Sequence, residues 1–540
     1  MLNFKTTDRK DWVSHGFWLC AFLCFGLSIS YSVNIPFLDD YGLVLDFLST
    51  FTSAHSPLEK LQILGTPVNN HLIVTYYLLI LMDYEIFGEI DFQHLIFAIN
   101  LCYLAILYVI YRIFISTGIR PYYFIPVILL FSIPVYNLIN WSSSGMHVLP
   151  VLFALLTILA FVRESKYPFT EACIYATLAA LSSGGGMLAF ICAVPFLLQR
   201  KNTKEWTIWI LIFSSLLFIY VHNFGSMGHT FAAKEMITYV INLLVFFGTI
   251  FKPFYGDHHL WGIIFGFLIL GGICWTFLFR WKFLKENPIL LAGLALALAL
   301  ALLTTITRSQ LGLGVTTAYR YRLYHMLPLI FLYLFLLKSR SRMDNRFYLI
   351  LVSISVILYG FRMEDAWSVL QRQGHQLQMG MEVYRLTGSP DQLSYRSTLK
   401  AKEILTEASN KGHYHIPSGH KFDPLVYPGH GVHLQSMHYH LNQFKNESTF
   451  VVASGWAYPS FASSVNIDIL FWVESKGQKL YFRTAPFLSN RVLMAKSDLS
   501  FLIILDKSRI PVDWAEVNFG LALIDPIRGI TSETSIVLLN

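Results

Sequence analysis

Long apolar segments dominate the first two thirds of the chain. Between residues 13 and 362 they alternate with short polar loops, whereas residues 363–540 have the mixed pattern of a water-soluble sequence. Because a helix of about 20 apolar residues crosses a hydrocarbon core of about 30 Å, this pattern predicts a polytopic α-helical membrane part. We expect about eleven transmembrane helices, at residues 13–33, 94–115, 121–140, 147–163, 169–183, 187–199, 206–223, 258–280, 288–306, 323–338 and 346–362.

Two further apolar segments, 72–88 and 234–251, must either cross the membrane or remain interfacial or re-entrant. If neither crosses, 17 Lys and Arg residues collect on the side of the N-terminus and six on the opposite side of the membrane part. Crossing by 72–88 would move Arg112 and Arg120 outward and weaken this bias. The positive-inside rule therefore predicts a cytoplasmic N-terminus and an external C-terminal part. The carboxylates within and just after 72–88 also suit a helix in the headgroup layer better than one at bilayer depth.

Composition agrees with this assignment and narrows the function. The chain is 55% hydrophobic and 14% charged, whereas soluble domains average about 25% charged residues. The net charge of +7 comes from short loops between apolar segments, so it indicates membrane orientation and gives no reason to expect nucleic acid as a partner. All six cysteines lie in apolar segments, which excludes a disulfide framework from the soluble part.

The last third of the chain changes from helical to β patterning. We expect helices at 364–386 and 391–411, and then strands at 450–458, 464–473, 479–485, 500–506 and 518–525 that form an antiparallel β-sandwich. The predicted domains are a membrane domain (1–362) with an outward loop at 34–93, a helical, His-rich connector (363–448), and the sandwich (449–540). We interpret the connector histidines as surface or loop residues, and a metal site there is the alternative.

Adjacent carboxylates follow the first predicted span. Asp39 and Asp40 lie just beyond its predicted external end, where a carboxylate can orient and deprotonate an acceptor hydroxyl. The same position would also suit a cap for the following helix or a ligand for a divalent cation. The residues leave open whether a metal is needed.

Polar residues gather at two other places on the predicted outer side. Asn69, Asn70 and His71 precede the segment that contains Asp83, and these four side chains are candidates for binding acceptor or sugar hydroxyls. Arg308, Arg320 and Arg322 lie in an outward loop, against the positive-inside bias. Arginine offers planar donors for phosphate, so these three are candidates to bind the phosphate of a lipid donor, and headgroup anchoring is the alternative.

In the residues just described, the chain resembles the GT-C superfamily of membrane glycosyltransferases, and within it a bacterial group with a C-terminal β-sandwich. The resemblance rests on Leu38-Asp39-Asp40-Tyr41, Val68-Asn69-Asn70-His71-Leu72, Met82-Asp83-Tyr84-Glu85-Ile86-Phe87-Gly88, Arg320-Tyr321 and Ser454-Gly455-Trp456-Ala457. In the second of these motifs, Asn70 and Leu72 replace an acidic and a basic residue of the group's pattern. The resemblance implies a GT-C-like fold, and it assigns the catalytic base to Asp39 or Asp40.

The expected function is therefore transfer of a sugar from a polyprenyl-phosphate donor to a glycan, lipid or protein acceptor. The resemblance implies that this occurs on the periplasmic side of a bacterial inner membrane. A polymerase or ligase that uses polyprenyl-diphosphate donors would fit the same features. A membrane transporter is a further alternative, although it predicts internal repeats and ionisable groups at mid-membrane that the sequence does not display.

Overall fold

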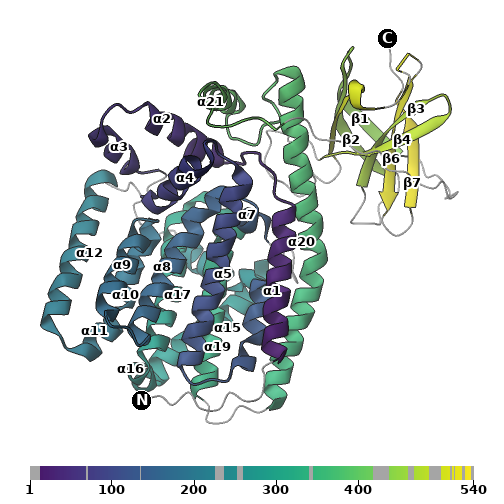
Figure 1. The fold of residues 1–540 in the computed structure, drawn as a ribbon. Helices are drawn as coiled ribbons and strands as arrows, with labels where there is room; N and C mark the ends of the chain where they lie inside the picture. Colours follow the sequence, from purple (N-terminus) through teal and green to yellow (C-terminus); the bar gives the residue numbers. More distant parts are fainter. Residues whose placement is uncertain are drawn as a thin grey trace. The chain divides into compact units, whose positions relative to one another are not determined.

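The chain folds into two compact units, which we describe separately (Figure 1). In the computed structural model the described residues are 12–68, 71–133, 135–224, 236–251, 259–339, 345–417, 437–459, 468–485, 500–510, 512, 514–515, 517–525 and 529–536. The helical unit comprises residues 1–32 and 47–370. The second unit comprises residues 33–46 and 371–540.

The helical unit is built from α-helices joined by short 3-10 turns (Figure 1). Its first helices are α1 (Trp12–Ser30), α2 (Phe47–Ser53), α3 (Pro57–Leu64), α4 (Val74–Phe87), α5 (Phe92–Ser116), α6 (Ile125–Phe131), α7 (Tyr136–Ile139), α8 (Gly145–Val162) and α9 (Pro168–Ala180). They are followed by α10 (Leu188–Cys192), α11 (Val194–Arg200), α12 (Thr203–Phe224), α13 (Met236–Gly248), α15 (His259–Phe279), α16 (Trp281–Glu286), α17 (Pro288–Arg308), α18 (Leu313–Thr316) and α19 (Arg322–Ser339). The next helix, α20 (Asn345–Thr387), begins in this unit and ends in the second.

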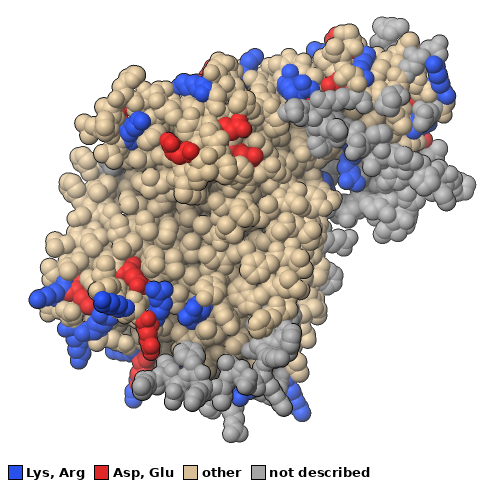
Figure 2. All heavy atoms as spheres, viewed as in Figure 1, with Lys and Arg blue, Asp and Glu red and all other residues tan. Residues whose placement is uncertain are grey.

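Six helical segments among the described residues are long and apolar enough to cross a membrane. They are Phe92–Ser116, Ser142–Val162, Thr203–His222, His259–Phe279, Pro288–Leu311 and Leu313–Ser339. On the face drawn in Figure 2, charged side chains lie towards the two ends of the helical unit, with a wide uncharged zone between them. The chain is therefore a membrane protein with a soluble C-terminal β part, as the apolar pattern predicted.

The prediction of eleven spans is wrong for these residues, because several apolar segments do not form long helices. The predicted span 121–140 divides into a 3-10 turn (Pro121–Phe124), α6 and α7. The predicted spans 169–183 and 187–199 become the 13-residue α9 and an apolar stretch that divides into a 3-10 turn (Gly184–Met187), α10 and α11. Proline and glycine end these helices early, because proline removes a helical donor and glycine has low helix propensity.

The other predicted spans and surface segments agree with the structure to different degrees. Residues 12–30 form an apolar helix that is shorter than the candidate spans, and the apolar residues 348–360 are the first part of the longer helix α20. The segment predicted at 72–88 forms the 14-residue α4, and its place at the membrane surface stays a prediction.

α13 packs closely on α15, where a Cβ added to Gly266 would lie 1.7 Å from the backbone oxygen of Leu244. Only glycine fits this crossing without movement of one backbone.

α20 is one continuous 43-residue helix. The predicted boundary at 362/363 is a change of polarity and does not break the helix. Residues 364–386 are therefore helical, as predicted, but they continue the preceding helix and do not form a separate one. Near its C-terminal end, Met379 and Val383 belong to the hydrophobic core of the β part. The Met379 Sδ atom accepts the Ile504 backbone N–H at 3.1 Å. The prediction at 391–411 becomes α21 (Thr398–Asn410), whose N-cap Ser397 accepts the N–H of Lys400.

The C-terminal part is an antiparallel sandwich, as the strand pattern predicted. Its strands are β1 (Met437–Asn446), β2 (Phe450–Pro459), β3 (Asp468–Ser475), β4 (Gln478–Arg483), β5 (Ser500–Asp506), β6 (Val517–Asp525) and β7 (Gly529–Ser535). The sheets have the orders β1-β2-β5 and β4-β3-β6-β7. Val451 and Ile503 from one sheet share a buried core with Phe471 and Leu521 from the other, which is the packing expected of two stacked sheets.

Candidate functional site

A cluster of positive and aromatic side chains lies in the helical unit around the end of α17 and the start of α19. Arg308 is the last residue of α17, and its Nη2 atom lies 3.3 Å from Nε2 of His71. His147, in the first turn of α8, lies within electrostatic range of Arg308, Arg320 and His71. We call His71, His147, Arg308 and Arg320 the arginine–histidine cluster.

His71 enters this cluster as a neutral ring. Burial, with a smaller effect from Arg308, lowers the pKa of His71 to about 4. Since arginine can only donate, Nε2 of His71 must accept from Arg308, which places the ring hydrogen on Nδ1. Nδ1 is buried, and no described residue accepts a hydrogen bond from it. It lies beside Gly184, where an added Cβ would be 3.5 Å away.

The three candidate phosphate-binding arginines do not share one environment. Arg308 and Arg320 are half-buried, and no carboxylate among the described residues pairs with either. The Arg320 guanidinium lies 5.2 Å from the Tyr321 ring centroid. Arg322 is only 3% exposed and lies within electrostatic range of Tyr103 and His325 in the helical core. The structure therefore brings Arg308 and Arg320 to one cluster and directs Arg322 inward.

The predicted hydroxyl-binding residues are also separated. His71 belongs to the arginine–histidine cluster, whereas Asp83 on α4 faces the start of α5. Its Oδ1 lies 3.6 Å from Nδ1 of His94, and its Oδ2 is buried and has no hydrogen-bond donor among the described residues. Burial raises the pKa of Asp83 to about 6, and His94 partly offsets that rise. Asn69 and Asn70 lie outside the described residues.

The two adjacent carboxylates lie in the second unit, in a tightly shaped turn. Leu38 has a φ of +50°, which is uncommon for a residue with a side chain, and its N–H donates to Ser394 O at 2.8 Å. A π-helical turn (Tyr41–Asp46) follows directly. Strained backbone and π turns are frequent at functional sites.

Asp39 and Asp40 differ in what they can offer a ligand. Asp40 is 1% exposed, and its Oδ2 accepts the Phe37 N–H at 3.0 Å. Asp39 is half-buried, and no described group bonds to its carboxylate. Burial, together with the charge of Asp40, raises the pKa of Tyr41. Asp40 therefore holds the turn, and Asp39 is the carboxylate that a ligand can reach.

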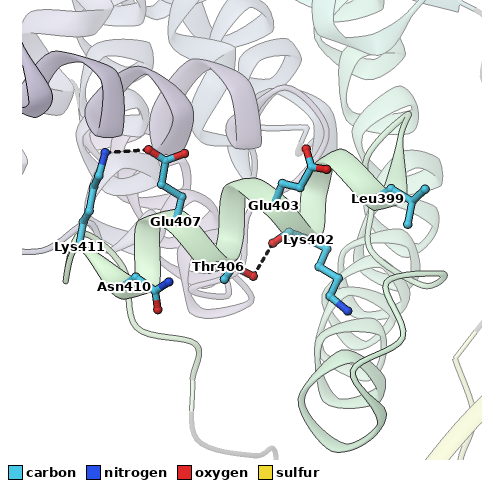
Figure 3. A pocket seen from close by; sticks show the side chains of 7 residues that line it. All are labelled: Leu399, Lys402, Glu403, Thr406, Glu407, Asn410 and Lys411. Atoms are coloured by element: carbon cyan, nitrogen blue, oxygen red, sulfur yellow. Dashed lines mark hydrogen bonds and ion pairs between the residues drawn. The ribbon is translucent and has the colours of Figure 1, made fainter.

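α21 packs against this turn with its apolar side, which includes Ile404 and Leu405. Its other side carries Lys402, Glu403, Thr406, Glu407 and Lys411 around a shallow depression, and Lys411 pairs with Glu407 at 2.7 Å (Figure 3). Burial raises the pKa of Asp46, and Lys400 on this helix opposes the shift. These contacts support the turn and add no further catalytic group.

Sequence reasoning missed His147, because a lone histidine in an apolar segment gives no signal until the fold brings Arg308 to it.

Among the described residues, no group of three or more His, Cys, Asp and Glu side chains could hold a metal ion. His413 and His415 lie just after α21, and His438 and His440 lie in β1. His420, His430 and His433 lie outside the described residues.

The chain matches no protein-family model, and comparisons with curated proteins and with solved structures find no match either.

Proposed function

We propose that the protein is a membrane glycosyltransferase of the GT-C type that takes a sugar from a polyprenyl-phosphate donor. The arginine–histidine cluster binds the donor phosphate, and Asp39 activates the acceptor hydroxyl. The acceptor oxygen attacks C1 of the sugar, the bond from C1 to the phosphate oxygen breaks, and the hydroxyl proton passes to Asp39. The acceptor is a glycan, a lipid or a protein.

One observation carries the proposal: the charges of Arg308 and Arg320 are unpaired among the described residues. Positive groups at the end of apolar helices are costly to bury without a counter-charge. His71 stays neutral beside them, which limits repulsion and keeps an N–H donor available. A phosphate would neutralise the cluster, and its growing negative charge as the sugar leaves would be stabilised there.

The assignment of Asp39 as the base rests on exposure and hydrogen bonding. A general base must reach the proton it removes. Asp40 has an oxygen committed to the Phe37 N–H and is almost fully buried, so we assign it a positioning role. We infer that Asp40 keeps the Leu38 turn in shape and thereby orients Asp39.

We place the reaction on the outer, periplasmic side of a bacterial inner membrane. The support is the sequence charge bias, which puts the N-terminus in the cytoplasm. The same bias puts Asp39 and Arg308 on the opposite side, where lipid-linked sugars would be used.

The test is transfer of a labelled sugar from its polyprenyl phosphate by purified full-length protein. Asp39→Asn should lower turnover by about 10²–10⁴-fold, the usual contribution of a general base, with donor affinity unchanged. The matched control is Glu59→Gln, which changes an exposed carboxylate in the same predicted outward loop and should leave turnover unchanged. Near-native turnover in Asp39→Asn would refute its role as the base.

A diphosphate-linked donor tests the alternative function. If the protein transfers glycan only from polyprenyl diphosphate, the monophosphate proposal is wrong and the polymerase or ligase alternative stands. If it binds neither lipid, the cluster has another anionic partner and the transferase proposal fails.

A further inference from the structure

An apolar cavity of about 500 Å³ lies in the helical unit, well along α19 from the arginine–histidine cluster. Its walls come from α6, α15, α19, α20 and the short turn after α13. Representative lining residues are Val127, Leu130, Phe265, Ile330, Ile354 and Leu358. The volume is within the range of small-molecule sites.

The side chains that line the cavity offer no free hydrogen-bond donor to a polar ligand or to water. The two hydroxyl groups that line it are already committed: Tyr333 donates to Tyr123 O at 2.7 Å, and Ser355 donates to Leu351 O at 2.8 Å. Water in a buried site needs two to four polar partners, so an apolar cavity stays dry. The occupant that fits this lining is a hydrocarbon chain.

The cavity opens through the side of α20. Ile354 and Ile357 line it and are 46% and 53% exposed. Neighbouring residues on the same helix, such as Ile350, are also exposed and apolar. In a bilayer this face meets lipid tails, which can enter without passing through water.

One end of the cavity has features that suit an anionic headgroup. Tyr333 connects it to a group of tyrosines, in which the Tyr122 and Tyr123 rings lie 4.3 Å apart and Tyr348 contacts both. Arg120 is exposed and immediately precedes the Pro121–Phe124 turn that carries Tyr122 and Tyr123. Tyrosine and arginine together are typical of the membrane interface, where they contact headgroups.

We propose that this cavity holds the acyl chain of an anionic phospholipid, with its headgroup beside Arg120. The site is separate from the proposed donor site. Arg320 precedes the first residue of α19, whereas Tyr333 is near the end of that helix at Ser339. The lipid would fill the space between the lining helices and would thereby stabilise the fold.

The test uses full-length protein purified in mild detergent and matched tryptophan variants of α20. Ile354→Trp fills the mouth of the cavity, while Ile350→Trp changes an exposed residue one turn away that does not line it. Mass spectrometry of extracted lipid should find stoichiometric phosphatidylglycerol in the wild type and in Ile350→Trp. Ile354→Trp should retain about tenfold less, because the cavity is overfilled.

A second measurement guards against a folding defect in the filled variant. Added phosphatidylglycerol should raise the Tm of the wild type and of Ile350→Trp, but not that of Ile354→Trp. Arg120→Ala should remove the preference for phosphatidylglycerol over phosphatidylcholine. Equal retention by the two tryptophan variants, no retained phospholipid in the wild type, or retention of polyprenyl phosphate in its place would each overturn the proposal. An unchanged lipid preference in Arg120→Ala would overturn the headgroup assignment.

Discussion

Replacing Asp83 with asparagine should stabilise the protein at neutral pH and leave its stability unchanged in acid. Asp83 is only 7% exposed, and burial raises its pKa from 3.8 to about 6. The folded protein therefore holds the Asp83 proton more tightly than the unfolded chain does. Stability is greatest below pH 4 for this group, and it falls as the pH rises through about 6.

The magnitude follows from the size of the shift. A difference of about two pKa units corresponds to about 3 kcal/mol at 1.36 kcal/mol per unit. This shift already includes the opposing electrostatic effect of His94, whose Nδ1 lies 3.6 Å from the Asp83 carboxylate. We therefore expect Asp83→Asn to gain about 1–3 kcal/mol at pH 8, where the carboxylate is charged.

The assay is thermal unfolding in detergent at pH 4.5 and pH 8, followed by the loss of a native-state signal. Asp83→Asn should have a higher Tm than the wild type at pH 8, with the difference shrinking towards pH 4.5. Glu85→Gln changes an exposed carboxylate on the same helix and should show no pH-dependent difference. A lower Tm of Asp83→Asn at pH 8 would refute the reasoning, because the charged carboxylate would then be stabilising the fold.

Three further predictions concern the donor site, helix packing and topology. Arg320→Ala should weaken binding of the lipid donor by about 1.5–3 kcal/mol. Arg320→Lys should weaken it less, because lysine keeps the charge but lacks the planar donor fork. Unchanged donor affinity of Arg320→Ala in a binding titration would favour the alternative that Arg320 only anchors lipid headgroups. Gly266→Ala should lower stability by about 1–3 kcal/mol through its clash with the Leu244 backbone, whereas Gly271→Ala on the same helix meets open space and should be mild; equal Tm values would contradict the close crossing. A reporter active only in the periplasm should be active after Asn540 and silent at Asn202, and the reverse pattern would remove the predicted orientation.

Much of the fold could be predicted because it depends on local patterns. A long apolar segment such as 288–306 must form a helix in a bilayer, since no other structure satisfies its backbone there. The strands at 450–458 and 500–506 were predicted from their short β-rich apolar runs. β1 and β7 were missed, because each pairs with a neighbour on one side only and carries many polar residues. Such strands do not show the apolar pattern of central ones.

Helix continuity was harder to predict than hydrophobicity. The sequence marks a polarity change near residue 362, yet α20 runs through it, because polar residues continue a helix as readily as apolar ones. Conversely, the apolar segment 121–140 does not form one helix, although its composition allows a span. Hydropathy reports the environment of a segment and not where its helix begins or ends.

The sequence by itself determined which residues could carry charge and chemistry, and the tertiary structure decided which of them act together. Arg308 and His71 are 237 positions apart, and only packing of the helices brings their side chains to 3.3 Å. The same packing buries Arg322 and adds His147 to the cluster. In the second unit it distinguishes Asp39 from Asp40, two identical side chains in adjacent positions. The physical reason is that burial, and the partners a polar group finds, depend on residues far away in sequence.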